Sequence, residues 1–489
     1  MHRRLLPRLG DFLFVCLFAG CLLVGQRMLN IDSDLGRHLV LGTYMIESRS
    51  IPVRDVLSFT MRGEPRPPYE WLAQILFAVA HRLLGLDGVV LLTSLVIGCA
   101  FLLLYVDARE RSGAPLVALV LTVWAAAASS LHWLTRPHVF SFLCLVLWLR
   151  LLDRLRLGQK ETVWQLPLLM LVWANLHGGF IVGFLAWAAY VAGWAVERWR
   201  RSAPPEVGFR LLLAGVTSLA ASVVTPDLWS NWAAVLRNSS AYVLARTTET
   251  MPVDFAAVSS WPFLGLLALG LLLAFPNRRS ITPAHGFLLL GLGVLGVAMA
   301  RNIPLFSIGA VPILAIWSRQ LLGGQSRLAL LERTTSRIES GLRALIWPPL
   351  AVSLAAIFLA FHSLTGQRSV YTFEPAIFPV LAANWMETHP IEGEMFNEID
   401  WGGYLLYRMW PERRVFIDSQ SDFYGEQYAR DYAAVVGAAD GWEEQLSRHG
   451  ISWVVISPGA PLAERLRLDT GWQAAYQDST AVIFVQKHE

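Results

Sequence analysis

The stretch LNIDSDLGRHLVLG, residues 29–42, decides how the chain is organised, because it follows an apolar segment and brings charged side chains to its end. The apolar segment, about residues 11–29, runs directly into Asp32 without the small-residue pattern at which signal peptides are cleaved. We therefore expect it to remain in the protein as a membrane-spanning helix. The charged side chains then lie where this helix leaves the bilayer.

The composition is that of a membrane protein. Of the 489 residues, 55% are hydrophobic and 16% are charged, whereas about one quarter of the residues of a soluble domain are charged. The net charge of +3 is too small to indicate a nucleic-acid partner. All four cysteines lie inside apolar blocks, where they act as small hydrophobic residues. The composition predicts an α-helical polytopic membrane protein.

The apolar residues fall in blocks of about 20, the length of a transmembrane helix. These blocks predict eleven spans, at about 11–29, 87–106, 115–132, 138–153, 163–176, 179–196, 208–224, 260–275, 283–299, 303–318 and 344–362. We expect a transmembrane domain over residues 1–362, with a first outside loop at 30–86, and an extracytoplasmic α/β domain over 363–489.

The basic residues indicate the orientation in the membrane. With the N-terminus in the cytoplasm, the arginines gather on the cytoplasmic side of the spans, as the positive-inside rule requires. An odd number of spans then leaves the C-terminus outside, in a multi-pass protein of the inner or plasma membrane. The first outside loop breaks the rule, since five arginines lie in its first part, between residues 30 and 66. These arginines are Arg37, Arg49, Arg54, Arg62 and Arg66. They either belong to a solvated loop or bind an anionic headgroup or phosphate.

The first outside loop is predicted to contain two amphipathic helices on the membrane surface, in 33–48 and 69–85, joined by an irregular crossing. Asp34 and His38 are four residues apart and would share one helix face. A carboxylate there has three candidate roles: to cap the helix, to bind a divalent cation, or to remove a proton from an acceptor hydroxyl. Asp32 or Ser33 suits the cap, and Asp34 is the candidate base, with Asp32 as the alternative.

The segments DSDLGRHLVLG, IPVRDVLSFT and GEPRPPYEWLAQ resemble the first loop of the GT-C superfamily of glycosyltransferases. That superfamily includes the protein O-mannosyltransferases and the lipid A aminoarabinose transferases. The order of one span, an outside loop opened by acidic residues, further spans and a terminal outside domain is also similar. Here the acidic motif is Asp-Ser-Asp, whereas the mannosyltransferases have an adjacent acidic pair, so the choice between Asp32 and Asp34 stays open.

The resemblance implies an inverting transfer of a sugar from a polyprenyl-phosphate donor to a glycan, lipid or protein acceptor at the outer face. Three polar groups, in LTRPHVFSF, WANLHGGF and ARNIPLF, lie at span ends on the same side as Asp34 and are expected to converge on its cavity, although each alone could snorkel or cap a helix. The candidate substrate- and phosphate-binding residues are Arg37, His38, Asp55, Glu70, Arg136, His138, Asn175, His177, Arg301 and Asn302.

No cofactor is required by the sequence, and a divalent cation, Mg²⁺ or Mn²⁺, held by Asp34 and Glu249 is the alternative. In the C-terminal domain, EMFNE, RRVFIDS, SWVVIS and AVIFVQK are predicted strands. A stretch rich in Asp, Trp, Tyr and Gly provides candidate acceptor-binding residues, whose aromatic members could instead pack the domain against the membrane part. These candidates are Asp400, Trp401, Tyr404, Asp418 and Asp422.

Two other classes of function compete with a glycosyltransferase. A transporter or flippase of a lipid-linked saccharide would place polar residues at the middle of its spans, whereas here they lie at span ends. A non-catalytic envelope assembly protein would not need so many spans. The sequence lacks HEXXH, Walker A, dinucleotide-binding and serine-nucleophile motifs, which argues against a zinc protease, an ATP-driven pump and a serine hydrolase.

Overall fold

The computed structural model describes residues 6–236, 251–322, 326–342, 346–365 and 369–487. The chain divides into two compact units, which are interleaved in the sequence. Unit 1 consists of Met1–Gly25, Val90–Leu228 and Thr247–Gln367. Unit 2 consists of Gln26–Val89, Trp229–Arg246 and Arg368–Glu489. The first outside loop predicted from the sequence therefore groups with the C-terminal residues.

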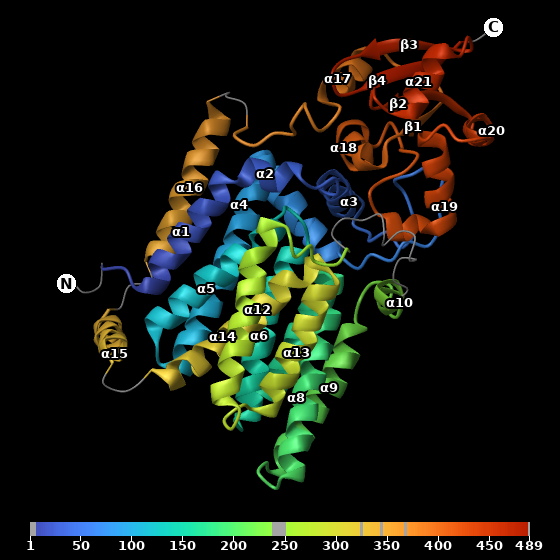
Figure 1. Cartoon of the computed structure of the whole chain (residues 1–489). Coiled ribbons are helices and arrows are strands. Elements are labelled where there is room, and N and C mark those ends of the chain that lie inside the picture. The colour runs from blue at the N-terminus through green and yellow to red at the C-terminus, as the bar shows by residue number, and fades with distance from the viewer. Residues whose placement is uncertain (1–5, 237–250, 323–325, 343–345, 366–368, 488–489) are drawn as a thin grey trace. The chain divides into compact units, whose positions relative to one another are not determined.

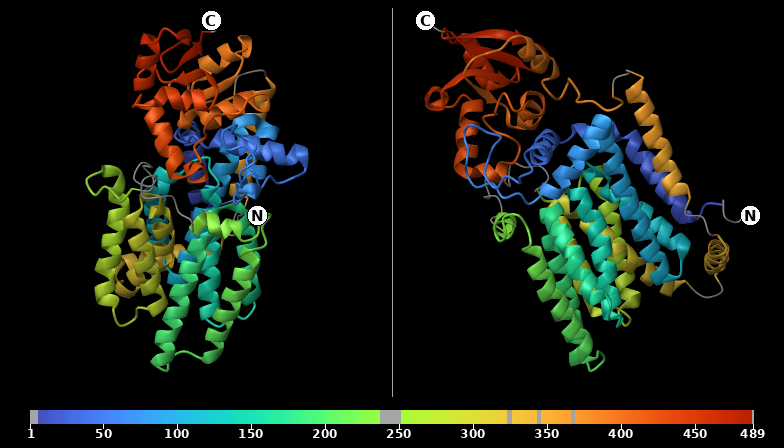
Figure 2. Two further views of the ribbon diagram at one scale, coloured as in Figure 1. Left: turned by 90° about the vertical axis from the view of Figure 1, so that its right-hand side faces the viewer. Right: turned by 180° about the vertical axis from the view of Figure 1, so that it is seen from behind.

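Unit 1 is built of helices, whose course can be followed in Figures 1 and 2. They are α1 (Leu9–Leu23), the second part of α4 (Trp71–Ser112), α5 (Pro115–Ser129), α6 (His138–Arg156), α7 (Thr162–Leu176), α8 (Ile181–Trp199), α9 (Pro205–Ser222), α12 (Trp261–Asn277), α13 (Pro283–Ala298), α14 (Ile303–Leu321), α15 (Arg327–Ser340) and α16 (Trp347–Leu364).

Among the described residues, six helices are long and apolar enough to cross a membrane. They are Trp71–Ser112, Pro115–His132, Gly178–Trp199, Val258–Asn277, Ala300–Leu321 and Trp347–Leu364. Three shorter apolar helices are Leu9–Leu23, Thr162–Leu176 and Pro283–Ala298. Each of the predicted spans coincides with a helix, because long apolar blocks are a local property of the sequence. The number of membrane crossings stays a prediction.

Small residues and satisfied indole groups hold the helices of unit 1 together. An added methyl group at Gly193 of α8 would overlap the backbone of Ala284 in α13, so the glycine permits a close approach of the two helices. The buried Trp148 donates its indole N–H to the carbonyl oxygen of Gly183 at 2.7 Å. The buried Trp173 donates to Ser141 Oγ at 2.8 Å. These two indole groups are thus paired inside an apolar bundle.

Two buried glutamates of α15 bind the first amides of other helices. Glu332 accepts hydrogen bonds from the backbone N–H groups of Leu116 and Val117 at 2.9 and 2.8 Å, at the start of α5. Glu339 accepts from the N–H of Leu9 at 2.9 Å, at the start of α1. The first amides of a helix have no partner within the helix and carry partial positive charge, so carboxylates suit them well. These contacts fix α15 where α1 and α5 begin.

We predict that Glu332→Ala lowers the free energy of unfolding by about 1–2 kcal/mol, because two amides lose their acceptor. Glu332→Gln retains an acceptor oxygen and should lose less. Arg333→Ala, next to it on the exposed side of α15, serves as the control. Thermal unfolding of the purified protein in detergent measures the difference, and equal midpoints for Glu332→Ala and Arg333→Ala would contradict the capping role.

Unit 2 combines N-terminal and C-terminal helices with one small sheet (Figure 1). Its helices are α2 (Gly25–Asn30), α3 (Leu35–Ser48), the first part of α4, α10 (Ser230–Leu236), α17 (Val380–Thr388), α18 (Ile399–Met409), α19 (Ser421–Val436), α20 (Trp442–Arg448) and α21 (Pro461–Leu468). Helix α4 is interrupted at Leu84 and Gly85, where Gly85 has a φ of 61°, a conformation that suits glycine.

The sheet has the strand order β1-β2-β4-β3. Strand β1 (Glu394–Asn397) is parallel to β2 (Ile451–Ile456), and β4 (Val482–Gln486) is antiparallel to both β2 and β3 (Trp472–Gln477). Alternating apolar side chains of the central strands are buried against the helices. Three of the predicted strands are confirmed, and β3 was not predicted.

The predicted strand RRVFIDS, residues 413–419, is wrong. Only Val415 makes a ladder-like contact, an isolated bridge with Ser58. The side chain of Asn397 instead binds the backbone, since it accepts from Phe416 N–H at 2.9 Å and donates to Ile417 C=O at 2.9 Å. The buried backbone groups are therefore satisfied without a neighbouring strand.

Helix α18 was not predicted, because it contains Gly402 and Gly403, and glycine is a poor helix former. The glycines permit close packing against α3. A methyl group at Gly36 would overlap the carbonyl oxygen of Gly403, and one at Gly403 would overlap that of Ser33. Helix α3 is accordingly largely buried by other residues of unit 2. Its position at the membrane surface stays a prediction.

We predict that Gly36→Ala lowers the free energy of unfolding by about 1–3 kcal/mol, because the added methyl group overlaps backbone atoms that cannot rotate away. Gly20→Ala is a matched control, since Gly20 is also helical and has no atom within 4 Å of an added methyl group. Thermal unfolding in detergent compares the two variants. A Gly36→Ala protein as stable as Gly20→Ala would show that α3 and α18 are not packed this closely.

Candidate functional site

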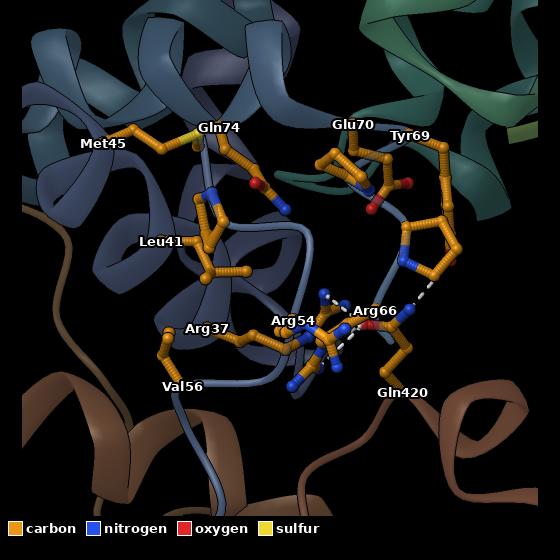
Figure 3. Close-up of a pocket in the computed structure, with 13 residues that line it drawn as sticks. Arg37, Leu41, Met45, Arg54, Val56, Arg66, Tyr69, Glu70, Gln74 and Gln420 are labelled. Atoms are coloured by element: carbon orange, nitrogen blue, oxygen red, sulfur yellow. Dashed lines mark hydrogen bonds between the residues drawn. The ribbon is translucent and has the colours of Figure 1, made fainter. Parts of the chain in front are cut away.

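A pocket in unit 2 gathers the polar residues that follow the first span. Figure 3 shows the guanidinium groups of its arginines close to Gln420, with Glu70 and Tyr69 on another side. Apolar side chains, among them Leu41, complete the lining. The polar lining residues are Arg37, Arg54, Arg66, Tyr69, Glu70, Gln74 and Gln420.

Asp34, the predicted base, lies at the N-cap position of α3 and is 4% exposed. Its Oδ1 accepts a hydrogen bond from Arg37 Nη2 at 2.9 Å and another from the hydroxyl of Ser419. A charge-assisted bond of this kind orients a carboxylate firmly. Ser419 comes from the loop before α19 and was not recognised in the sequence.

Asp32 has a different position from Asp34. Its Oδ1 accepts from the backbone N–H of Asp34 at 3.1 Å and closes the turn that precedes α3. This is a common role of aspartate where a helix begins. The geometry thus gives Asp32 the structural contact that was expected for a cap and leaves Asp34 next to the arginine.

Arg37 and Arg66 are 3% and 5% exposed and face three carboxylates. Arg66 binds Asp418 through two contacts of 3.1 and 2.9 Å and also pairs with Asp55. Arg37 Nε lies 3.8 Å from Asp418 Oδ1. Burial opposes the charge on both arginines, but Asp34 and Asp418 beside Arg37, and Asp418 and Asp55 beside Arg66, outweigh it and raise the pKa of each guanidinium. Both stay charged at any ordinary pH.

Gln420 joins the two arginines. Its carbonyl oxygen accepts from Arg37 Nη1 at 3.1 Å and from Arg66 Nη2 at 2.7 Å, and its amide donates to the Tyr69 hydroxyl at 3.2 Å (Figure 3). Burial and the charge of Asp422 raise the pKa of Tyr69 well above its ordinary value, so its hydroxyl stays protonated and donates to Asp422 Oδ2 at 3.4 Å. We name the set Asp34, Arg37, Asp55, Arg66, Asp418 and Gln420 the arginine cluster.

His38 lies four residues after Asp34 and contacts Gln74 and Glu70. His38 Nδ1 lies 3.3 Å from the amide nitrogen of Gln74 and 3.9 Å from Glu70 Oε2. Asp55 also binds Ser58, at 2.9 Å through the backbone and 2.7 Å through the hydroxyl, and so shapes the loop around the arginine cluster.

The five candidate acceptor residues separate into two groups. Trp401 and Tyr404 are 5% and 2% exposed, and Tyr404 packs against Phe373 and Phe378. Neither ring offers a face to a sugar, so the structure corrects the predicted stacking. Asp418 is fully buried in the arginine cluster, whereas Asp400 and Asp422 are exposed.

Three of the predicted residues of unit 1 gather around His177. The centre of the His138 ring lies 6.4 Å from that of the His177 ring. Arg136 and Arg301 are near enough to interact electrostatically with His177. Ser141, which was not predicted, lies with its hydroxyl 2.9 Å from His177 Nδ1. The predicted convergence of these residues with Asp34 stays a prediction.

Two asparagines of unit 1 bind the backbone. The amide of Asn175 donates to the carbonyl oxygens of Leu171 and Val224 at 2.8 and 2.9 Å. The amide of Asn302 donates to Leu295 C=O at 3.2 Å. Both amides therefore serve helix ends in this structure, which is the alternative that the sequence left open for such residues.

The residues that the structure describes contain no group of three or more His, Cys, Asp or Glu that could hold a metal ion. Glu249, the second predicted metal ligand, lies outside the described residues. Asp34 is bound by Arg37 and Ser419. The guanidinium of Arg37 therefore supplies the positive charge beside this carboxylate. The described residues do not fit a metal centre, and the divalent cation stays a prediction.

The chain is similar in fold to solved structures of an oligosaccharyltransferase and of ArnT, both of which are GT-C glycosyltransferases. The Archaeoglobus fulgidus oligosaccharyltransferase in the apo form matches with a TM-score of 0.61 and 12% identity over 91% of this chain and 69% of that chain. The same enzyme tethered to an acceptor peptide with the NVT sequon matches with a TM-score of 0.61 and 12% identity over 97% of this chain and 74% of that chain.

ArnT from Cupriavidus metallidurans in the apo state matches with a TM-score of 0.51 and 15% identity, over 97% of both chains. No family profile matches the sequence, and no curated protein matches it. At these identities the similarity is one of fold. The GT-C resemblance inferred from the first outside loop is confirmed at that level.

Proposed function

We propose that the protein transfers a sugar from a polyprenyl-phosphate donor to an acceptor at the outer face of the membrane. The observation that carries the proposal is the likeness of nearly the whole chain to an oligosaccharyltransferase and to ArnT. The fixed carboxylate of Asp34 beside a pocket lined by arginines supports it.

In the proposed reaction the acceptor hydroxyl attacks the anomeric carbon from the face opposite the phosphate. Asp34 takes the hydroxyl proton, the bond between the anomeric carbon and the phosphate oxygen breaks, and polyprenyl phosphate leaves. Arg37 and Ser419 hold Asp34 in position. Arg54 is the exposed arginine of the pocket, and we assign to it the stabilisation of the charge that develops on the departing phosphate.

We predict that Asp34→Asn lowers the rate of transfer by roughly a hundredfold to ten-thousandfold, the range typical of a lost general base. Donor binding should persist. Transfer of a labelled sugar from a polyprenyl-phosphate donor in reconstituted vesicles measures the rate, and retention of the labelled donor lipid measures binding.

Two variants separate catalysis from structure at Asp34. Ser419→Ala removes one hydrogen bond but keeps the carboxylate, so its effect should be much smaller. Asp32→Asn keeps the oxygen that accepts from Asp34 N–H and should be mild. The reverse ranking of Asp32→Asn and Asp34→Asn would exchange their roles. Near-normal transfer by a folded double variant would remove both residues from the chemistry.

We also predict a cytoplasmic N-terminus and an extracytoplasmic C-terminus in the cell membrane, from the distribution of arginines. A reporter that is active only after export, fused after Glu489, should be active, and a reporter that works only in the cytoplasm should be silent there. The opposite pattern would place the C-terminal residues, and with them Ser419 and Gln420, on the cytoplasmic side.

A further inference from the structure

Helix α15 of unit 1 presents three different faces. The first is turned to the protein: Ala329, Glu332 and Glu339 are buried, and the two glutamates bind the first amides of α5 and α1. Glu339 also lies 3.3 Å from Arg109 at the end of α4. Residues seven apart in a helix lie on one face, so the two glutamates fix the rotation of α15 about its axis.

The second face is apolar and exposed. Leu331 and Ile338 are also seven residues apart, and they are 56% and 60% exposed. Leu328, three residues before Leu331, extends the same face and is exposed as well. Side chains of this size lose favourable free energy in water. An apolar face of this kind in a polar helix fits the acyl region of a lipid leaflet.

The third face is basic. Arg333 and Arg337 are four residues apart and therefore neighbours on the helix surface, and both are exposed. On a helix with 100° per residue they lie to the side of the buried face away from Leu331 and Ile338. A helix with apolar side chains on one face and arginines on another is typical of a helix that lies in the headgroup region.

The chain on both sides places α15 at the level of the membrane boundary. It connects Ala300–Leu321 and Trp347–Leu364, two helices that are long and apolar enough to span a bilayer. It is bound to the start of α5, where another candidate span begins, and to the start of α1, near which Figure 1 shows it. A helix fixed at the ends of spans meets headgroups on its basic face and acyl chains on its apolar face.

We propose that α15 is an interfacial helix that inserts Leu328, Leu331 and Ile338 into the lipid leaflet and binds the phosphate groups of anionic phospholipids through Arg333 and Arg337. The partner is the bilayer surface, because the charge of the arginines complements anionic headgroups and the apolar side chains match lipid. The glutamate contacts transmit the position of this helix to α1 and α5. The proposal is independent of the glycosyltransferase activity.

The first test measures depth with the full-length protein in vesicles of phosphatidylcholine and phosphatidylglycerol. Bimane is attached to Leu331→Cys, and to the matched control Ser340→Cys, which lies seven residues after Arg333 on the basic face. Both are made in a Cys16→Ala background, because Cys16 is exposed. Bimane at residue 331 should be quenched by a nitroxide on the acyl chains and protected from aqueous iodide, and bimane at residue 340 should be quenched by iodide.

The second test measures lipid preference at residue 331 with nitroxide-labelled phosphatidylglycerol or phosphatidylcholine. The labelled protein with both arginines intact should be quenched more strongly by the anionic lipid than by phosphatidylcholine. In the Arg333→Gln and Arg337→Gln double variant this preference should fall by about fivefold for each arginine removed. Arg333→Lys with Arg337→Lys should retain most of it. Elution of all variants as one species in detergent confirms that they fold.

Equal access of iodide to residues 331 and 340 would overturn the proposal, because α15 would then lie in water. Protection of residue 331 from both quenchers would overturn it too, since a protein surface would then cover the apolar face. An unchanged preference for phosphatidylglycerol in the glutamine variant would overturn the role of the two arginines.

Discussion

The pairing of two buried arginines with three carboxylates is the interaction on which unit 2 depends. Burying a guanidinium without a partner would cost several kcal/mol, and Arg37 and Arg66 find partners on chain segments that are far apart in the sequence. Asp34 and Asp55 come from the N-terminal part of unit 2, and Asp418 and Gln420 come from the C-terminal part. The arginine cluster therefore requires both parts to be present.

The cluster also changes how the charge of the first outside loop should be understood. The sequence suggested either solvated arginines or arginines that meet a phosphate. Arg37 and Arg66 are not solvated, because they are buried and paired with carboxylates of the same unit. Contact of Arg37 with a phosphate stays a prediction. Arg54, which lines the same pocket, is exposed. In the proposed reaction, Arg37 would position the candidate base and Arg54 would meet the donor phosphate.

The sequence predicted the helical membrane part well, because a long apolar block is recognisable without knowledge of its neighbours. It also selected Asp34, Arg37 and Asp418. It missed Ser419 and Gln420, because their partners Asp34 and Arg66 lie hundreds of residues away in the chain. Local pattern also failed where tertiary contacts override it. The two glycines of α18 made the helix unrecognisable from its sequence. In residues 413–419 the side chain of Asn397 provides hydrogen bonds that a neighbouring strand would otherwise supply.

The carboxylate contacts of α15 have a consequence for biosynthesis. Helices α1 and α5 leave the ribosome early, but Glu332 and Glu339 are made only after most of the bundle. Until then the first amides of both helices rely on water or headgroups for hydrogen bonds. The two early helices thus reach their final polar contacts only when a late segment arrives, so a chain truncated before α15 leaves the bundle with two incompletely bonded helix ends.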